Sequence, residues 1–219
     1  MVHRHLLEGS RFFTAALEGE WKEAKTRTIT LAEDDPDVFA VYINWLYEKT
    51  LSTSVGITEE DIRTEIKTLI KAYVLGDMIG HDNFCDIVID ALIRCCVERN
   101  KYLSFANIIY IYEGCSDTSK LRKLAVDQWY YRSKDNWLAT NLHCLPKEFF
   151  IDLSSTFVRL REKTHDNNRR ENALWFLDPC AYHLHDESSK DCYLSRDGHG
   201  GEIPDPLTVK GTKKRKRDI

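Results

Sequence analysis

The residues best suited to metal chemistry lie near the C-terminal end of the sequence. Cys180, His183, His185 and Cys192 form the pattern C-x2-H-x-H-x6-C. Two thiolates and two imidazoles make a tetrahedral ligand set that zinc accepts. On extended backbone the two histidines would point to one face, and the polar residues 186–191 could turn the chain to bring Cys192 close. The pattern predicts a structural zinc site whose four protein ligands leave no open position for catalysis.

Two other interpretations of these four residues stay open. The spacing differs from that of a standard zinc finger, and thiols and imidazoles in a polar loop are often incidental. A redox-linked pair of Cys180 and Cys192 is the third interpretation. If zinc binds, its role is to stabilise a segment that has little apolar core of its own.

A dense basic run is the second candidate site. Lys213, Lys214, Arg215, Lys216 and Arg217 are consecutive and have no large apolar neighbours except the last residue of the chain. An extended polycation can lie in the acidic groove of an import receptor, so the run predicts a nuclear import signal. A solvated tail and a weak phosphate-binding arm are the alternatives.

The basic run conceals an acidic body. The chain has a net charge of −4, but its last ten residues carry six positive charges and one negative charge, which leaves −9 on residues 1–209. A body with this charge lacks the electrostatic footprint of a nucleic-acid-binding protein. Nucleic acid is therefore not expected as a partner, although the zinc-like segment and basic tail together would suit a nuclear DNA-associated regulator, which is the alternative hypothesis.

Patterns typical of catalysis do not occur in the sequence. It contains no glycine-rich phosphate loop, no Gly-x-Ser-x-Gly and no His-Glu-x-x-His. Cys95 and Cys96 follow the apolar register of a helix and are expected to be buried thiols. Asp35 before Pro36 is explained by helix capping. We expect no enzymatic activity and no certain cofactor.

These side chains are positioned by a sequence that reads as mainly α with a small β component. Thr28–Leu31 alternates like a short half-buried strand, and Gly9-Ser10 interrupts an otherwise helical opening. Asp82 and Ser104 are expected to cap helices, and Gly76 or Gly80 to end one. Apolar residues at helical spacing predict buried faces: Phe39, Tyr42, Ile43, Leu46 and Tyr47; Ile66, Leu69, Ile70, Tyr73 and Val74; Phe84, Ile87, Val88, Ala91, Leu92, Cys95 and Cys96; Phe105, Ile108, Ile109 and Tyr112; Leu121, Leu124, Ala125 and Trp129; Phe149, Phe150, Leu153, Phe157 and Leu160.

Composition and targeting signals indicate an intracellular protein without a membrane span. Hydrophobic residues make up 42% of the chain and charged residues 30%, as in ordinary soluble domains. The longest near-continuous apolar run, residues 108–112, is too short to cross a bilayer, and no secretory leader is evident. Seven cysteines, most at helical core positions, read as reduced thiols. The nucleus or the cytoplasm is the expected location.

Several segments, in order, resemble the BTB/POZ domain of the fungal type. The opening segment has a histidine, a leucine and then Ser-x-Phe-Phe, as in that family. The segments that carry the resemblance are Val2-His3-Arg4-His5-Leu6-Leu7-Glu8-Gly9-Ser10-Arg11-Phe12-Phe13, Glu23-Ala24, Ile29-Thr30-Leu31, Glu33-Asp34-Asp35-Pro36, Phe39, Asn44-Trp45-Leu46-Tyr47, Lys71-Ala72-Tyr73-Val74-Leu75-Gly76-Asp77 and Leu145-Pro146-Lys147-Glu148-Phe149. Together they cover roughly half the chain, and the ordered set is more specific than any one piece. The Cys-x-Tyr-His-x-His…Cys stretch also resembles one near the C-terminus of many fungal members.

The resemblance implies a helix-rich domain that recruits other proteins, in some relatives to a cullin ubiquitin-ligase scaffold. Members usually begin with strands ahead of the position of His3, which is where this chain starts, so the family's usual dimer interface and cullin contact cannot simply be assigned. We expect an N-terminally truncated BTB/POZ-like domain in residues 1–110, a helical extension in 111–164, a Cys/His-containing segment in 165–194 and a disordered basic tail in 195–219. Its function would be a non-catalytic, adaptor-like protein–protein interaction module, with self-association or a cullin scaffold among the expected partners. Exposed aromatic residues in 100–160 are the expected anchors.

Overall fold

The computed structural model of the chain describes residues 2–18, 22–26, 28–30, 35–51, 53, 56–132, 144–160 and 179–184. This part of the chain is mainly helical, which confirms the helical half of the expected fold class. Its elements are α1 (Arg4–Leu7), α2 (Arg11–Glu18), α3 (Lys22–Thr26), α4 (Pro36–Glu48), α5 (Glu59–Ile79), α6 (Asp82–Glu98), α7 (Phe105–Gly114), α8 (Lys120–Arg132), α10 (Lys147–Leu160) and the 3-10 helix η2 (Pro179–Tyr182).

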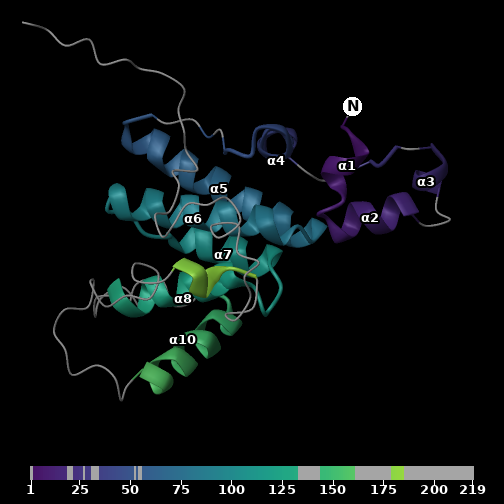
Figure 1. Cartoon of the computed structure of the whole chain (residues 1–219). Coiled ribbons are helices and arrows are strands. Elements are labelled where there is room, and N and C mark those ends of the chain that lie inside the picture. Colours follow the sequence, from purple (N-terminus) through teal and green to yellow (C-terminus); the bar gives the residue numbers. More distant parts are fainter. Residues whose placement is uncertain are drawn as a thin grey trace, which may run out of the picture.

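The longer helices are layered largely in chain order. α4 lies against α5, α5 against α6 and α7, and α8 lies between α7 and α10 (Figure 1). The short helices α1 to α3 sit to one side, near the C-terminal end of α5 (Figure 1). η2 is the exception to chain order, because it returns to lie on α6 and α8.

Three of the predicted signals at helix ends act as expected, at Asp35, Gly80 and Ser104. Asp35 caps α4 by accepting a hydrogen bond from the backbone N–H of Asp37 at 3.1 Å, and Pro36 fills the first helical position. Gly80 ends α5 in the left-handed conformation, with φ of 62°. Ser104 begins α7 through a capping box with Asn107. These ends fix where each apolar stripe starts and therefore which face it presents to the core.

An aromatic cluster joins the N-terminal helices to the α5–α6 turn. The rings of Tyr42 and Trp45 from α4 lie 5.0 Å from that of Phe84, and the Trp45 ring lies 4.9 Å from that of His81. Nearby, Ser10 is buried and donates its hydroxyl hydrogen to the Ile79 carbonyl at 2.6 Å. The hydrogen bond of Ser10 thus attaches the opening segment to the α5–α6 turn, and the aromatic rings attach α4 to the same turn.

Two further contacts hold the same junction. The backbone N–H of Arg11 donates to the Gly80 carbonyl at 3.1 Å, and its guanidinium lies 2.9 Å from the Asp82 carboxylate. Asp82 is the first residue of α6 and its N-cap position is taken by His81, so the prediction that Asp82 caps this helix is wrong by one residue. The carboxylate instead receives Arg11 from the opening segment.

The register of α4 also differs from the prediction. Val38, Val41 and Trp45 are buried there along with Tyr42 and Leu46, whereas Tyr47 is 47% exposed. The buried stripe follows the side that meets His81 and Phe84, and this places Tyr47 outside it. Its hydroxyl instead lies 2.7 Å from Nδ1 of His3.

The predicted strand does not appear in the described part of its range. Residues 28–30 carry no strand, and Leu31 lies outside the described residues. A strand needs a hydrogen-bonding partner, and the described residues supply none for this segment.

Candidate functional site

A short segment from late in the chain packs onto two helices that end more than forty residues before it. Residues 179–184, here called the latch segment, comprise η2 and the two residues after it. The segment contacts α6 and α8, and Figure 1 shows η2 lying over these helices. Tyr182 and His183 within it are both 0% exposed.

On α8 the latch segment meets a buried carboxylate. The Tyr182 hydroxyl donates a hydrogen bond to Oδ2 of Asp127 at 2.8 Å. Nζ of Lys123, one turn earlier on α8, lies 3.0 Å from the same oxygen. That ammonium also lies 3.9 Å from the centre of the Tyr182 ring, within the range of a cation–π interaction. One tyrosine is therefore recognised through both its hydroxyl and its ring.

On α6 the latch segment meets two more carboxylates, spaced one turn apart. Nε2 of His183 lies 3.1 Å from both Oδ1 and Oδ2 of Asp90. The backbone N–H of Leu184 donates to Oδ1 of Asp86 at 2.8 Å. Since an ionised carboxylate can only accept, Nε2 of His183 carries the donated hydrogen.

The three carboxylates that the latch segment contacts are buried, so their hydrogen bonds matter for stability. Asp86, Asp90 and Asp127 are each almost fully enclosed, and a buried charge is costly unless hydrogen-bonded partners compensate it. Burial and the adjacent Asp127 charge raise the pKa of Tyr182 well above its usual value, so the phenol remains a hydrogen-bond donor. We call the surface formed by Asp86, Asp90, Lys123 and Asp127 the docking face.

The structure places the predicted zinc ligands only in part. The backbone of Cys180 lies in η2, and His183 is bound to Asp90, while His185 and Cys192 lie outside the described residues. Among the residues that are described, no three His, Cys, Asp or Glu side chains are grouped so as to hold a metal ion. The zinc hypothesis therefore remains a prediction.

One feature of His183 bears on that hypothesis. Histidines that bind metals usually donate their other ring N–H to a carboxylate, which fixes the ring's orientation. The contact of Nε2 with Asp90 has this form. A metal bound to His183 in this arrangement would be bound through Nδ1.

The other predicted sites divide between described and undescribed residues. Lys213, Lys214, Arg215, Lys216 and Arg217 lie outside the described part, so the import signal remains a prediction. Cys95 and Cys96 are buried, as expected, and burial raises the pKa of each thiol to about 12. Thiols that resist ionisation in this way are poor nucleophiles.

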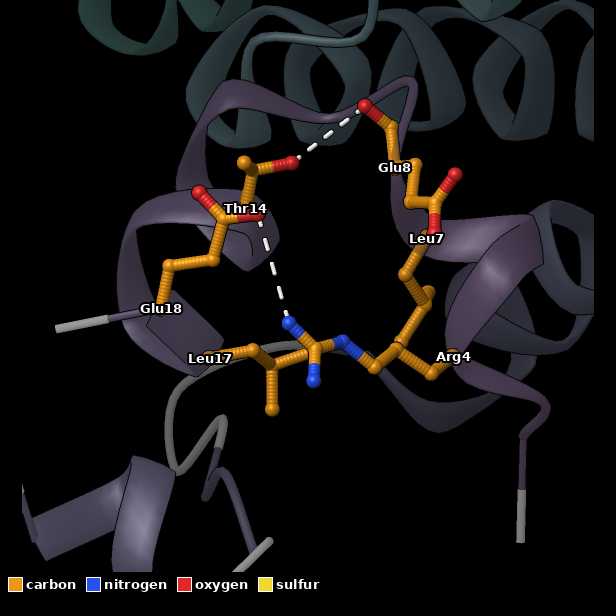
Figure 2. A pocket seen from close by; sticks show the side chains of 6 residues that line it. All are labelled: Arg4, Leu7, Glu8, Thr14, Leu17 and Glu18. Carbon is orange, nitrogen blue, oxygen red and sulfur yellow. Dashed lines mark hydrogen bonds and ion pairs between the residues drawn. The ribbon is translucent and has the colours of Figure 1, made fainter.

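A pocket at the N-terminal helices is too small for an organic ligand. Figure 2 shows it between α1 and α2, where Arg4 reaches toward Glu18 and Thr14 donates to the carbonyl of Glu8 at 3.2 Å. The cavity has a volume of about 10 Å³. This is room for about one water molecule, whereas small-molecule sites occupy several hundred Å³.

A second buried histidine lies at the junction of α4, α5 and α6. Nδ1 of His81 is 2.9 Å from the Tyr42 hydroxyl. Burial, with a smaller contribution from Lys49, lowers the pKa of His81 to about 4, so the ring is neutral at physiological pH. Gly9 lies against the other side of this ring, where an added Cβ would lie 2.4 Å from Nε2.

The outer face of α10 exposes apolar side chains. Ile151 is 53% exposed and Val158 is 74% exposed, and the two are seven residues apart on the helix. The buried residues Phe149, Leu153 and Leu160 lie about half a turn away around the axis. Of the aromatic anchors expected in residues 100–160, the described part exposes Tyr110 by 40% and Phe157 by 44%. The prediction that Phe157 lies on the buried face of its helix is therefore wrong.

Sequence reasoning missed the docking face, although a signal was present. Asp86, Asp90 and Asp127 fall at core positions of otherwise apolar helices. An acidic residue at such a position needs a partner, and the sequence alone does not say which distant segment supplies it.

Comparison with known proteins adds no relative to this description. No protein-family model, curated protein or solved structure matches the chain. Within the described residues, no helix is long and apolar enough to traverse a bilayer.

Proposed function

We propose that the chain is a non-catalytic protein–protein interaction module that acts as an adaptor. The observation that carries this proposal is the outer face of α10, where Ile151 and Val158 stand exposed on the side opposite the helix's buried stripe. A surface helix ordinarily has polar residues on that side. Two apolar side chains two turns apart, with Ser154 and Ser155 between them, give the spacing by which a helix face binds a partner.

The BTB/POZ character of the module is part of the proposal. The opening segment supports this part of the proposal, because the residues that carry the resemblance there are buried or hydrogen-bonded in the fold. Ser10 bonds the end of α5 and Phe13 is buried, and Trp45, from a later segment of the resemblance, packs on the α5–α6 turn. The small β component, the recruitment of substrates to a cullin-type ligase and action within a nuclear complex belong to the same proposal.

The test is a comparison of associated proteins. The full chain and the double variant I151E/V158E are used as baits in quantitative affinity purification, with Glu60→Lys on the exposed side of α5 as a matched surface control. We expect a set of proteins that the wild type and the control enrich and the α10 variant loses at least tenfold. Identical sets for all three proteins would contradict the proposal that this face binds partners.

A further inference from the structure

We infer that the docking face of α6 and α8 is a peptide-recognition site that the latch segment occupies in cis, and that its ligand in trans is a partner segment carrying Tyr-His. This inference rests on the proposed function, because it names a site and a partner class for the interaction module. It differs in location from the α10 face, so the two can fail separately.

The docking face recognises features that any peptide with this dipeptide would bring. Asp127 accepts the phenol hydrogen, and Lys123 lies over the aromatic ring. Asp90 accepts the imidazole hydrogen, and Asp86 accepts a backbone N–H. The required ligand is thus an aromatic residue with a hydroxyl, followed by a histidine and a free backbone N–H.

Charge complementarity supports this ligand chemistry. Among the described contacts, the latch segment meets three carboxylates and one ammonium on the docking face. Its occupant supplies a hydrogen-bond donor to each of the three carboxylates and an aromatic ring to the ammonium. A peptide with acidic residues at these two positions would meet like charges and be rejected.

The nature of the contacts argues for recognition as well as packing. Buried polar pairs often contribute no more stability than apolar residues of similar volume would, and they make a contact selective. The latch segment contacts α6 and α8 and is held by side-chain and backbone hydrogen bonds from its last three residues, Tyr182, His183 and Leu184. Its departure would expose the carboxylates of the docking face to water, where they are readily hydrated.

The chain's own latch segment competes with an added peptide for the docking face, and this affects how the affinity of the peptide must be measured. Eighteen residues separate the end of α10 from the latch segment. Because the latch segment belongs to the same chain as the docking face, its binding there is intramolecular and does not depend on protein concentration. A peptide added to the wild-type chain must displace this occupant, so its apparent affinity is lower than for a chain whose latch cannot bind.

The experiment uses a fluorescent peptide with the sequence of residues 178–186 and serine in place of Cys180. Its binding to the full-length wild type, to Y182A/H183A and to Y182A/H183A/D90N is followed by anisotropy. We expect Y182A/H183A to bind the peptide at least tenfold more tightly than the wild type, and Asp90→Asn to reverse this gain at least tenfold. A peptide with alanine in place of Tyr-His should not bind.

Saturable binding that is equal within twofold for the wild type and Y182A/H183A would overturn the inference, as would no binding to a folded Y182A/H183A. If that variant does not fold, hydrogen exchange on the wild type replaces it. Excess peptide should then accelerate exchange of the Leu184 amide and leave α4 unchanged, and no acceleration would overturn the inference. A stable dimer that the peptide dissociates would also overturn it, because the occupant would then be the latch segment of a second copy.

The α10 variant separates this inference from the proposed function. I151E/V158E leaves the docking face intact, so it should bind the peptide like the wild type while losing its partners. If the peptide does not bind Y182A/H183A, while I151E/V158E still loses its protein partners, the docking site is rejected and the proposed function stands.

Discussion

His183 and Asp90 are in direct contact although 93 positions separate them in the chain. Nε2 of His183 lies 3.1 Å from each oxygen of the Asp90 carboxylate, and both side chains are 0% exposed. A hydrogen-bonded pair at this depth couples the end of the described chain to the middle of α6. The packing of the helices and the position of the latch segment are therefore not independent.

Replacement of His183 by alanine should destabilise the latch segment strongly. The substitution removes this donor from a buried carboxylate, and a hydrogen bond to a charged group typically contributes about 1.5–3 kcal/mol. Native-state hydrogen exchange should show faster exchange at Leu184, and the urea midpoint should fall. His5→Ala on the exposed face of α1 is the matched control. A change in His183→Ala as small as that in the control would show that the contact carries little energy.

Acid should destabilise the protein through His81. Its pKa in the folded chain is about 4, below the ordinary value of 6.5, so as the pH falls below 6.5 the unfolded chain binds a proton that the folded chain does not. Stability is therefore lost between about pH 6.5 and 4, by about 2 kcal/mol at pH 5. Urea unfolding at pH 7.5 and pH 5 measures this loss.

The variant His81→Gln isolates that contribution. Its amide oxygen can accept from the Tyr42 hydroxyl and does not titrate. Hydrogen bonds also lower the pKa values of Asp35, Glu59 and Asp61. The stability that these carboxylates contribute is lost on acidification to the same extent in the wild type and in the variant. The difference in slope between wild type and variant therefore reports His81. Parallel slopes would mean that the ring is not buried neutral.

Gly9→Ala should weaken the junction between the opening segment and the α5–α6 turn. The new Cβ would lie 2.4 Å from Nε2 of His81, a ring enclosed by Tyr42 and Trp45. Overpacking of this kind costs about 1–3 kcal/mol. Glu8→Ala, at the preceding exposed position, should have little effect on thermal unfolding. Equal melting temperatures for the two variants would contradict the close approach.

The zinc hypothesis makes a prediction that includes Asp90. If Cys180, His183, His185 and Cys192 bind zinc, the purified chain should contain one equivalent, and a chelator should destabilise it. Asp90→Asn should then weaken zinc binding by about 10–100-fold, because the carboxylate orients His183. A protein free of zinc after mild purification, with folding unchanged by chelation, would leave the thiols and imidazoles incidental.

The sequence indicates the helices well because their signals are local. The cap at Asp35, the left-handed Gly80 and the box at Ser104 depend on residues within a few positions, and each acts as predicted. The register of α4 could not be read in the same way. Trp45 is buried and Tyr47 exposed because of where His81 and Phe84 lie, and those residues follow more than thirty positions later.

The candidate site was less predictable for the same reason. His183 stood out by its type, but its partner Asp90 looked like an interruption in an apolar helix. The pairing of the latch segment with α6 and α8 joins residues that are 55 to 98 positions apart, so it depends on the fold of the chain between them. No local sequence pattern predicts this pairing. The strand expected at residues 28–31 failed for a related reason, because an alternating pattern does not show whether a neighbouring strand is present to pair with it.

Calorimetry with a purified partner measures whether the outer face of α10 binds another protein. A protein enriched with the wild-type chain is titrated against wild type, I151E/V158E and Glu60→Lys. Ile151 and Val158 are exposed, so their replacement should change folding stability by less than about 0.5 kcal/mol each. We predict an affinity at least a hundredfold lower for the α10 variant, as for loss of two central apolar contacts, and no change for the control. An affinity of the α10 variant within twofold of the wild type would show that this face does not bind the partner.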